Sequence, residues 1–286
     1  MNWRKVYIHF GKNNMEKTIL SGYLWGYDRP YTADICFKKF RESYSDGKLY
    51  FRLDVGGKEE EHKEICDKWG AKFLKNPMKV GRCGWMGHYE DWEEKGSDAL
   101  GRECWPKENA FTWMDGVYEA AKDCNSEYLI VMEDDTFILR PISVIEEGFG
   151  ISVCEYNCNQ LPNYLCNFID EIGGDSDIPR NLFGRRGYGA MGGFIINCET
   201  FIKGWDKLKP ILDERWDEIR EQTHLIGWVD VLPQLAVMSV KGKVIMNTQH
   251  VQTWYKERPD LYPAHSTWED YEIVDFLKDE HIIKNL

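Results

Sequence analysis

The chain has 286 residues, 43% of them hydrophobic, which is enough for one large α/β domain or two modest ones. No continuous apolar run approaches the roughly 20 residues that span a bilayer, and residues 1–10 reach only a short strand-like segment, so we expect neither a membrane span nor a signal peptide. The formal net charge of -12 argues against nonspecific binding to nucleic acid or anionic membrane, because both favour a basic surface.

The first half of the chain predicts alternating strands and helices. Residues 6–10 are typical of a first strand, and a polar loop then runs through Pro30. The next predicted elements are a helix over 32–44, a strand over 49–53, a helix that has glutamates at 59–61 and ends at Trp69-Gly70, a strand over 71–74, a helix capped by Asn109 and a strand over 128–132. This alternation predicts a parallel sheet whose ligands lie at the carboxyl ends of its strands.

Within the first half, residues 76–107 hold five glycines and three tryptophans with no clean period, which predicts an ordered loop insertion. The second half is less regular. The elements predicted after the strand at 128 are a strand near 151–154, a long loop to Arg180, a strand at 194–197, helices at 201–208 and 210–222, an apolar helix through Val240 and a strand at 244–246.

Nine cysteines are scattered along the chain without a Cys-x-x-Cys pair. Cys154, Cys158 and Cys166 could hold zinc together with a distant histidine, but their spacing lacks the usual paired knuckles. We therefore interpret the cysteines as reduced thiols of a cytoplasmic protein.

The most informative feature is the apolar run 128–132, which ends in Glu133, Asp134 and Asp135. The run fits a strand buried on both faces, whereas ionised carboxylates resist burial unless a cation or hydrogen-bond donors accompany them. A hard cation such as Mg²⁺ or Mn²⁺ takes oxygen ligands and commonly shares them with substrate phosphates. The run therefore predicts a metal site, with a solvated turn or a helix cap as the plainer alternative.

Taken in order, with Asp54 ending the second strand and the acidic triplet ending the fourth, these elements resemble the GT-A glycosyltransferases over residues 5–140 and more weakly to about 250. The resemblance implies an α/β, Rossmann-like fold with a mostly parallel central sheet, flanking helices and a smaller antiparallel element on the acceptor side. It implies a single domain over 1–286 with a nucleotide-sugar-binding half at 5–140, an acceptor-binding half at 141–255 and a C-terminal tail at 256–286.

The resemblance also implies residues for the donor site. In the family, a D-x-D motif holds Mn²⁺ or Mg²⁺ against the diphosphate of a nucleotide sugar. Here the first acid is Glu133, which would face the ribose or the metal, Asp135 would be the direct ligand, and Asp134 belongs to the same site. Asp54 matches the acid that contacts the base or ribose, with a turn-forming role as the equal alternative. Phe10, at the exit of the first predicted strand, lies where the family packs the base, although it could equally be core.

On the acceptor side, Gly193 matches the family's glycine-bearing segment before a strand. Glycine lets the backbone approach a sugar or phosphate closely, although it also serves in tight turns. Arg185, between glycines in an acidic chain, is a candidate contact for the diphosphate or the acceptor. An exposed, solvated arginine is the alternative.

Three further residues follow from the resemblance. Asp230 matches the acid that many inverting members use as a base, which the chemistry requires because the attacking acceptor hydroxyl must lose its proton. Its alternative role is the N-cap of the next helix. Trp228 would suit stacking on a sugar ring or plain packing. His250 follows the last predicted strand, where the family often places a third metal ligand, although a lone histidine is more often structural.

These residues predict a metal-dependent glycosyltransferase that moves a sugar from a nucleoside diphosphate donor to a glycan or other hydroxyl acceptor, by inversion if Asp230 is the base. A sugar nucleotidyltransferase is the nearest rival, but it should carry a glycine-rich phosphate loop after the first strand, where residues 9–14 offer only Gly11 and Lys12. A carbohydrate-binding protein without turnover is the second. Without an anchor, we expect a soluble cytoplasmic enzyme, like the stand-alone transferases of bacterial surface polysaccharides or of large DNA viruses, which act in the host cytoplasm.

Overall fold

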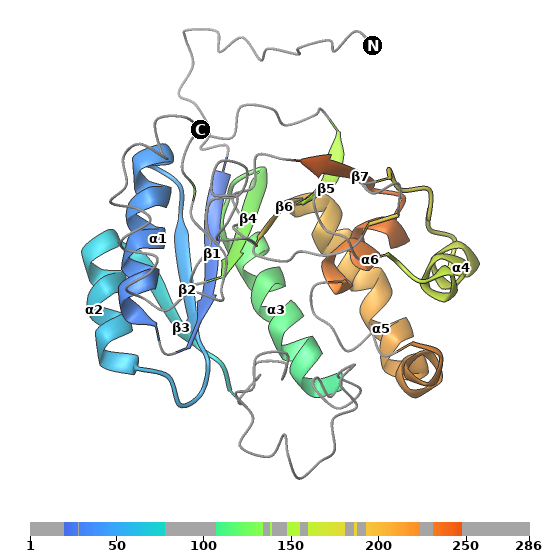
Figure 1. The fold of residues 1–286 in the computed structure, drawn as a ribbon, viewed down its shortest axis with the longest axis horizontal. Helices are drawn as coiled ribbons and strands as arrows, with labels where there is room; N and C mark the ends of the chain where they lie inside the picture. Colours follow the sequence, from blue (N-terminus) through green and yellow to red (C-terminus); the bar gives the residue numbers. More distant parts are fainter. Residues whose placement is uncertain are drawn as a thin grey trace, which may run out of the picture.

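The computed structural model describes residues 20–27, 29–77, 107–133, 138, 148–154, 160–180, 186–187, 193–223 and 231–247. Within them a seven-stranded sheet has the order β3-β2-β1-β4-β6-β5-β7 (Figure 1). The strands are β1 (Leu20–Gly26), β2 (Leu49–Leu53), β3 (Ala71–Lys75), β4 (Tyr128–Glu133), β5 (Phe149–Cys154), β6 (Phe194–Asn197) and β7 (Lys243–Asn247). All pairings are parallel except those of β6, which runs antiparallel to both β4 and β5. The predicted α/β class with a mostly parallel sheet and a smaller antiparallel element is confirmed.

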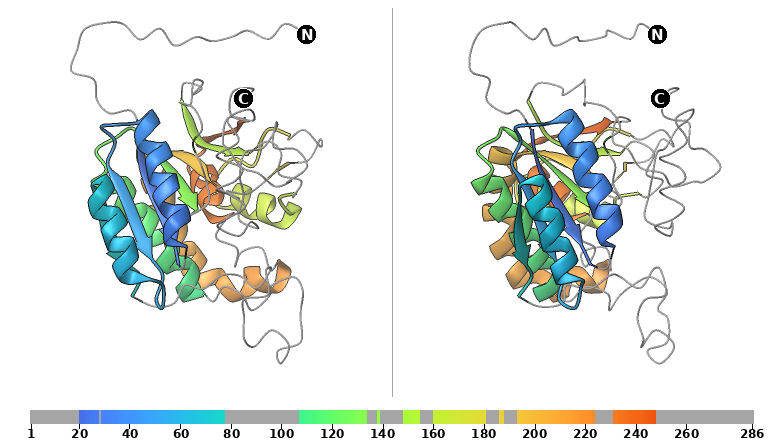
Figure 2. Two further views of the ribbon diagram at one scale, coloured as in Figure 1. Left: turned by 60° about the vertical axis from the view of Figure 1, so that its left-hand side comes forward. Right: turned by 90° about the vertical axis from the view of Figure 1, so that its left-hand side faces the viewer.

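Helices cover both faces of the sheet (Figure 2). They are α1 (Pro30–Ser43), α2 (Glu59–Trp69), α3 (Lys107–Asp123), α4 (Asn163–Glu171), α5 (Cys198–Gln222) and α6 (Leu232–Ser239). One core packs α1 and α2 on the sheet, and a second core packs α3 to α6 on the other side. Along β4, Leu129 and Val131 enter the second core while Ile130 and Met132 enter the first, because alternate side chains of a strand point to opposite faces. The apolar strand is therefore buried on both faces, as predicted.

Local sequence signals set several element ends. Helix α2 begins with three glutamates, which favour the positive end of its dipole, and it ends at Gly70, whose left-handed φ of 63° suits glycine. Asn197 caps α5, since its Oδ1 accepts the backbone N–H of Thr200 at 3.0 Å. Helix α3 starts at Lys107, so Asn109 lies inside the helix rather than at its cap as predicted.

Three predictions about element positions were wrong. The helices expected at 201–208 and 210–222 are one continuous helix, α5, because the buried side chains of Leu208 and Leu212 hold both sides of Pro210 against the core. The loop expected between 154 and 180 contains α4. The stretch read as a polar loop before Pro30 contains β1.

The first strand was missed because Ser21 and Gly22 interrupt its apolar pattern. Both are buried in the structure, and the glycine is required by packing: a Cβ at Gly22 would lie 2.8 Å from side-chain atoms of both Leu49 and Phe40. Residues 6–10, where the strand was expected, lie outside the described residues. Among the residues that the structure describes, none of the helices is long and apolar enough to cross a membrane.

Candidate functional site at the carboxyl edge of the sheet

The carboxyl ends of β2, β1 and β4 lie side by side. The register pairs Gly26 with Leu53 and Trp25 with Glu133. Asp54, which follows Leu53, therefore lies at the same edge as Glu133, with only β1 between them. Because neighbouring strands are about 4.8 Å apart, the two backbones are separated by about 10 Å across the sheet. Asp134 and Asp135 are the next two residues of the sequence after Glu133.

The start of β6 comes to the same edge because this strand is antiparallel to β4. Val131 pairs with Phe194, so Gly193 lies next to the end of β4. Gly193 is buried and has a φ of +129°, a backbone conformation that residues with a Cβ rarely adopt. The backbone geometry at this point therefore requires glycine.

Asp54 is held in place by hydrogen bonds at the turn after β2. Its side chain is 3% exposed, and its Oδ1 accepts the backbone N–H of Val55 at 3.0 Å and Nδ2 of Asn76 at 3.4 Å. Its backbone N–H donates to the Gly26 carbonyl at 3.1 Å, and its carbonyl accepts the N–H of Gly57 at 3.2 Å. Asp54 thus forms the turn, as the plainer reading predicts, and the same contacts fix its carboxylate at the edge.

A buried arginine is connected to Asp54 through the side chain of Asn76. Arg52 is 7% exposed, its Nη2 donates to Oε2 of Glu119 on α3 at 2.7 Å, and its Nη1 donates to Oδ1 of Asn76 at 3.5 Å. Gly116 makes room for this arrangement, since a Cβ there would lie 2.7 Å from the Tyr23 hydroxyl and 2.8 Å from Nε of Arg52. Sequence reasoning missed Arg52; the available signal was one charged residue inside an otherwise apolar strand.

An aromatic cluster lies beneath the edge on the face covered by α3. The Trp25 and Trp113 rings are 6.5 Å apart in an edge-to-face arrangement, and Trp113 lies 6.3 Å from the Phe194 ring. Trp25 is in the same row of the sheet as Glu133, and Phe194 follows Gly193. The backbone of the candidate site is therefore supported by large, closely packed side chains.

A buried glutamine connects two segments that carry other predicted residues. Gln234, in the first turn of α6, donates from Nε2 to the Gly187 carbonyl at 3.2 Å. Gly187 follows the predicted Arg185 by two residues, and α6 begins at Leu232, two residues after Asp230. Val231, between them, already has helical φ and ψ values of -90° and -30°.

The remaining predicted residues lie outside the described part of the chain. They are Phe10, Asp134, Asp135, Arg185, Trp228, Asp230 and His250, together with the side chain of Glu133. The strand next to β2 is β1, so the residue that leaves it beside Asp54 is Tyr27. The Tyr27 hydroxyl approaches Gly56, where a Cβ would lie 3.4 Å away.

Among the described residues there is no group of three or more His, Cys, Asp or Glu side chains that could hold a metal ion. The proposed ligand set of Glu133, Asp135 and His250 offers carboxylate oxygens and an imidazole, a donor set that fits Mn²⁺. Of these three residues, Glu133 is the last residue of β4, at the edge described above.

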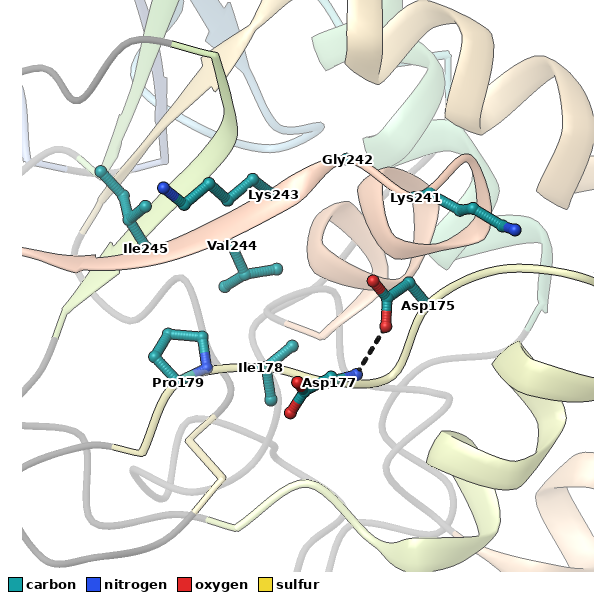
Figure 3. Close-up of a pocket in the computed structure, with 9 residues that line it drawn as sticks. All are labelled: Asp175, Asp177, Ile178, Pro179, Lys241, Gly242, Lys243, Val244 and Ile245. Carbon is teal, nitrogen blue, oxygen red and sulfur yellow. Dashed lines mark hydrogen bonds between the residues drawn. The ribbon is translucent and has the colours of Figure 1, made fainter.

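A cavity of about 440 Å³ lies elsewhere, at the amino end of the outer strand β7 (Figure 3). It lies between residues 241–245 and residues 175–179, and its lining carries both signs of charge, with Asp175 and Asp177 on one segment and Lys241 and Lys243 on the other. The Asp177 N–H donates to Oδ1 of Asp175 at 2.9 Å. The cavity is at the opposite end of the strands from Asp54, so it is separate from the candidate site.

No family model and no curated protein matches the chain. Similar solved structures include the galactosyltransferase LgtC in complex with donor and acceptor sugar analogs, with 11% identity, a TM-score of 0.38, and coverage of 90% of this chain and 95% of that chain. Glucosyl-3-phosphoglycerate synthase from Mycobacterium tuberculosis, in complex with Mn²⁺ and UDP, has 8% identity and a TM-score of 0.35, covering 91% and 78%. A cytidylyltransferase from Leptospira borgpetersenii has 10% identity and a TM-score of 0.37, covering 93% and 97%.

LgtC and the synthase are GT-A glycosyltransferases, the fold family that the sequence resembles.

Proposed function

We propose that the protein is a metal-dependent glycosyltransferase that moves a sugar from a nucleoside diphosphate donor to a hydroxyl acceptor. The observation that carries this proposal is the sheet register, which brings Asp54, the acidic segment that begins at Glu133, and Gly193 to one edge. Ligands of open parallel α/β sheets bind outside the carboxyl ends of the strands. The donor half is then 5–140 and the acceptor half 141–255.

In this proposal the nucleoside lies over the ends of β1 and β2. The fixed carboxylate of Asp54 accepts hydrogen bonds from the base or from the ribose hydroxyls. Tyr27, which leaves β1 beside it, offers an aromatic face for the base, the role that the sequence suggested for Phe10. The residue that stacks on the base then follows β1, and the residue that accepts the hydrogen bonds follows the adjacent strand β2.

The diphosphate lies over the end of β4. Glu133 and Asp135, with His250, hold Mn²⁺ or Mg²⁺, and Asp134 completes the acidic segment. When bound, the ion offsets the negative charge that grows on the leaving diphosphate. Arg185 adds a guanidinium that can donate two parallel hydrogen bonds to phosphate oxygens.

The acceptor enters between the start of β6 and the start of α6. Asp230 removes the proton of the attacking hydroxyl while the hydroxyl oxygen bonds to the anomeric carbon from the face opposite the departing nucleoside diphosphate, and this single displacement inverts the configuration. Gly193 and Trp228 border the acceptor, and the Gln234 contact to Gly187 holds the segment of Arg185 beside α6.

A donor screen tests the proposal. The purified protein is incubated with Mn²⁺ and each of the common UDP, GDP and dTDP sugars, and the released nucleoside diphosphate is measured. We expect release with one base, a loss of at least about 100-fold in Asp135→Ala, and a similar loss of transfer in Asp230→Asn. Glu60→Ala, which changes an exposed acid of α2, serves as the matched control.

Two other results would contradict the proposal. Release of pyrophosphate from a nucleoside triphosphate and a sugar 1-phosphate would identify a nucleotidyltransferase. Glycan binding that survives Asp135→Ala, without donor hydrolysis in either form of the protein, would identify a carbohydrate-binding protein without turnover.

A further inference from the structure

Two buried cysteines meet at the amino edge of the sheet, at the opposite end of β4 from the candidate site. Cys124 follows α3, Cys198 begins α5, and their sulfur atoms are 3.6 Å apart. The side chains are 3% and 5% exposed. The Cys198 N–H donates to the Glu127 carbonyl at 2.9 Å, so the backbone of Cys198 is joined to the segment that follows Cys124, next to the start of β4.

We propose that Cys124 and Cys198 form a reversible oxidation site, which closes to an intrachain disulfide when a peroxide oxidant is present. The Cys124 thiolate attacks one oxygen of hydrogen peroxide and becomes a sulfenic acid, and the O–O bond breaks to release hydroxide. The Cys198 sulfur then attacks the sulfenic sulfur and displaces its hydroxide. The two thiol protons convert both hydroxides to water, so two thiols and one peroxide give one disulfide and two waters.

The geometry favours this bond over other reactions of the pair. A disulfide has a sulfur–sulfur distance of about 2.05 Å, so the two atoms need to approach by only about 1.5 Å. The hydrogen bond from the Cys198 N–H to the Glu127 carbonyl keeps Cys198 in place while Cys124 reacts. A sulfenic acid formed on Cys124 therefore meets a thiol before it meets a second peroxide.

The surroundings also favour ionisation and access. The hydrogen bond from Cys198 is the main cause that lowers the pKa of Cys124 to about 7, and the Lys48 ammonium, which donates to the adjacent Asp123 carbonyl at 2.5 Å, acts in the same direction. Asn125, the next residue, is exposed in the connection between α3 and β4 and has a φ of 54°, so Cys124 lies directly under the surface. By contrast, burial raises the pKa of Cys66 to about 12.

The proposed bond has a structural consequence that is independent of catalysis. It would join positions 74 residues apart and link the end of α3 to the start of α5. Closing a loop of this length restricts the unfolded chain, so the oxidised protein should be more stable than the reduced protein. The carboxyl edge, which holds Asp54, is at the other end of the strands and should keep its shape.

Mass spectrometry of the full chain tests the proposal directly. The reduced protein is treated with hydrogen peroxide, free thiols are blocked, and the protein is digested without reductant. We expect one linked peptide pair that contains Cys124 and Cys198, two hydrogens lighter than the separate peptides and cleaved by dithiothreitol. The melting temperature should rise on oxidation in the wild type and in the control Cys66→Ser, but not in Cys198→Ala.

Several outcomes would overturn the proposal. One is sulfinic acid on Cys124 without a linked peptide, and another is a link between other cysteines. The third is that both thiols still react with the blocking reagent after unfolding, although free cysteine in the same tube has been oxidised by the peroxide. The wild-type measurement does not depend on whether a variant folds, and Cys124→Ser gives a second variant if Cys198→Ala does not. None of these readouts uses glycosyl transfer, so the test stands apart from the proposed function.

Discussion

Asn76 donates a hydrogen bond from Nδ2 to Oδ1 of Asp54 at 3.4 Å, while its own Oδ1 accepts from the buried Arg52 at 3.5 Å. One carboxamide thus connects the proposed nucleoside contact to an arginine that α3 holds through Glu119. The carboxylate at the site and the ion pair behind it are therefore parts of one hydrogen-bonded chain that crosses β2 and β3.

Replacing Asn76 tests this connection. Asn76→Ala leaves Arg52 with one acceptor fewer and releases one of the contacts of Asp54, so we expect a loss of about 1–2 kcal/mol in the free energy of unfolding. The donor KM should rise several-fold while kcat changes less, because Asp54 is proposed to bind the nucleoside and not the reacting bond. Urea unfolding and donor titration measure the two effects.

The neighbouring Lys75→Ala is the matched control, because it removes only an exposed ion pair with Glu59. Such pairs contribute little to stability. A donor KM that moves equally in both variants would rule out a specific role for Asn76.

Gly116 is expected to be intolerant of a side chain. In Gly116→Ala the new Cβ would lie 2.7 Å from the Tyr23 hydroxyl and 2.8 Å from Nε of Arg52, neither of which can move freely because both are buried. Alanine favours a helix by about 1 kcal/mol over glycine, whereas overpacking costs about 1–3 kcal/mol. We expect a net loss of stability in thermal unfolding.

Lys122→Ala, on the exposed side of the same helix, is the surface control, and it removes only a contact of the ammonium with the Tyr118 ring at 5.1 Å and one positive charge in the last turn. It should leave the free energy of unfolding within about 0.5 kcal/mol of the wild type. If Gly116→Ala proved as stable as Lys122→Ala, the packing of Tyr23 and Arg52 against α3 would not be tight.

Sequence and structure agree most closely where one residue decides the local geometry. The glycine at 70 ends α2, the glutamates at 59–61 start it, and the apolar run of β4 ends in acids, so these element ends could be read directly. The hydrophobic pattern did not predict β1, because close packing against Leu49 and Phe40 requires glycine at position 22. It also did not predict that α5 continues through Pro210, because contacts with the core hold the helix on both sides of the proline.

The candidate site could also be predicted only in part from the sequence. Asp54 and Glu133 were found because each follows an apolar strand, and the parallel order of strands places them at one edge. The support from Asn76 and Arg52 could not be predicted, because it depends on side chains from different strands meeting in space. The contact from Gln234 to Gly187 spans 47 positions and has no local signal.

Gly193 provides a test of the edge next to β4. Gly193→Ala places a Cβ on a backbone with a φ of +129°, which costs about 1–3 kcal/mol of strain. Because Gly193 is buried beside the end of β4, we expect kcat/KM for glycosyl transfer to fall at least about tenfold as well. Thermal unfolding and initial rates measure the two effects.

Gly148→Ala is the matched control, since Gly148 also has a positive φ, of 77°, and its Cβ would meet nothing within 4 Å. It should lose stability through backbone strain but keep its activity. Equal losses of activity in the two variants would show that strain alone, and not the position of Gly193, causes the effect.

The pH dependence of thiol oxidation gives the last prediction. The pKa of Cys124 is lowered to about 7, first by the hydrogen bond from Cys198, so the thiolate fraction rises as pH rises through 7. Hydrogen peroxide stays neutral over this range, and the rate of disulfide formation should therefore rise with a midpoint near pH 7 and level off above it. In Cys198→Ala the hydrogen bond is lost, so the midpoint for loss of the Cys124 thiol should move up, towards the ordinary thiol range near 8.5. Mass spectrometry of the blocked thiols at a series of pH values measures both midpoints, and a midpoint that is the same in the two proteins would show that Cys198 does not assist ionisation.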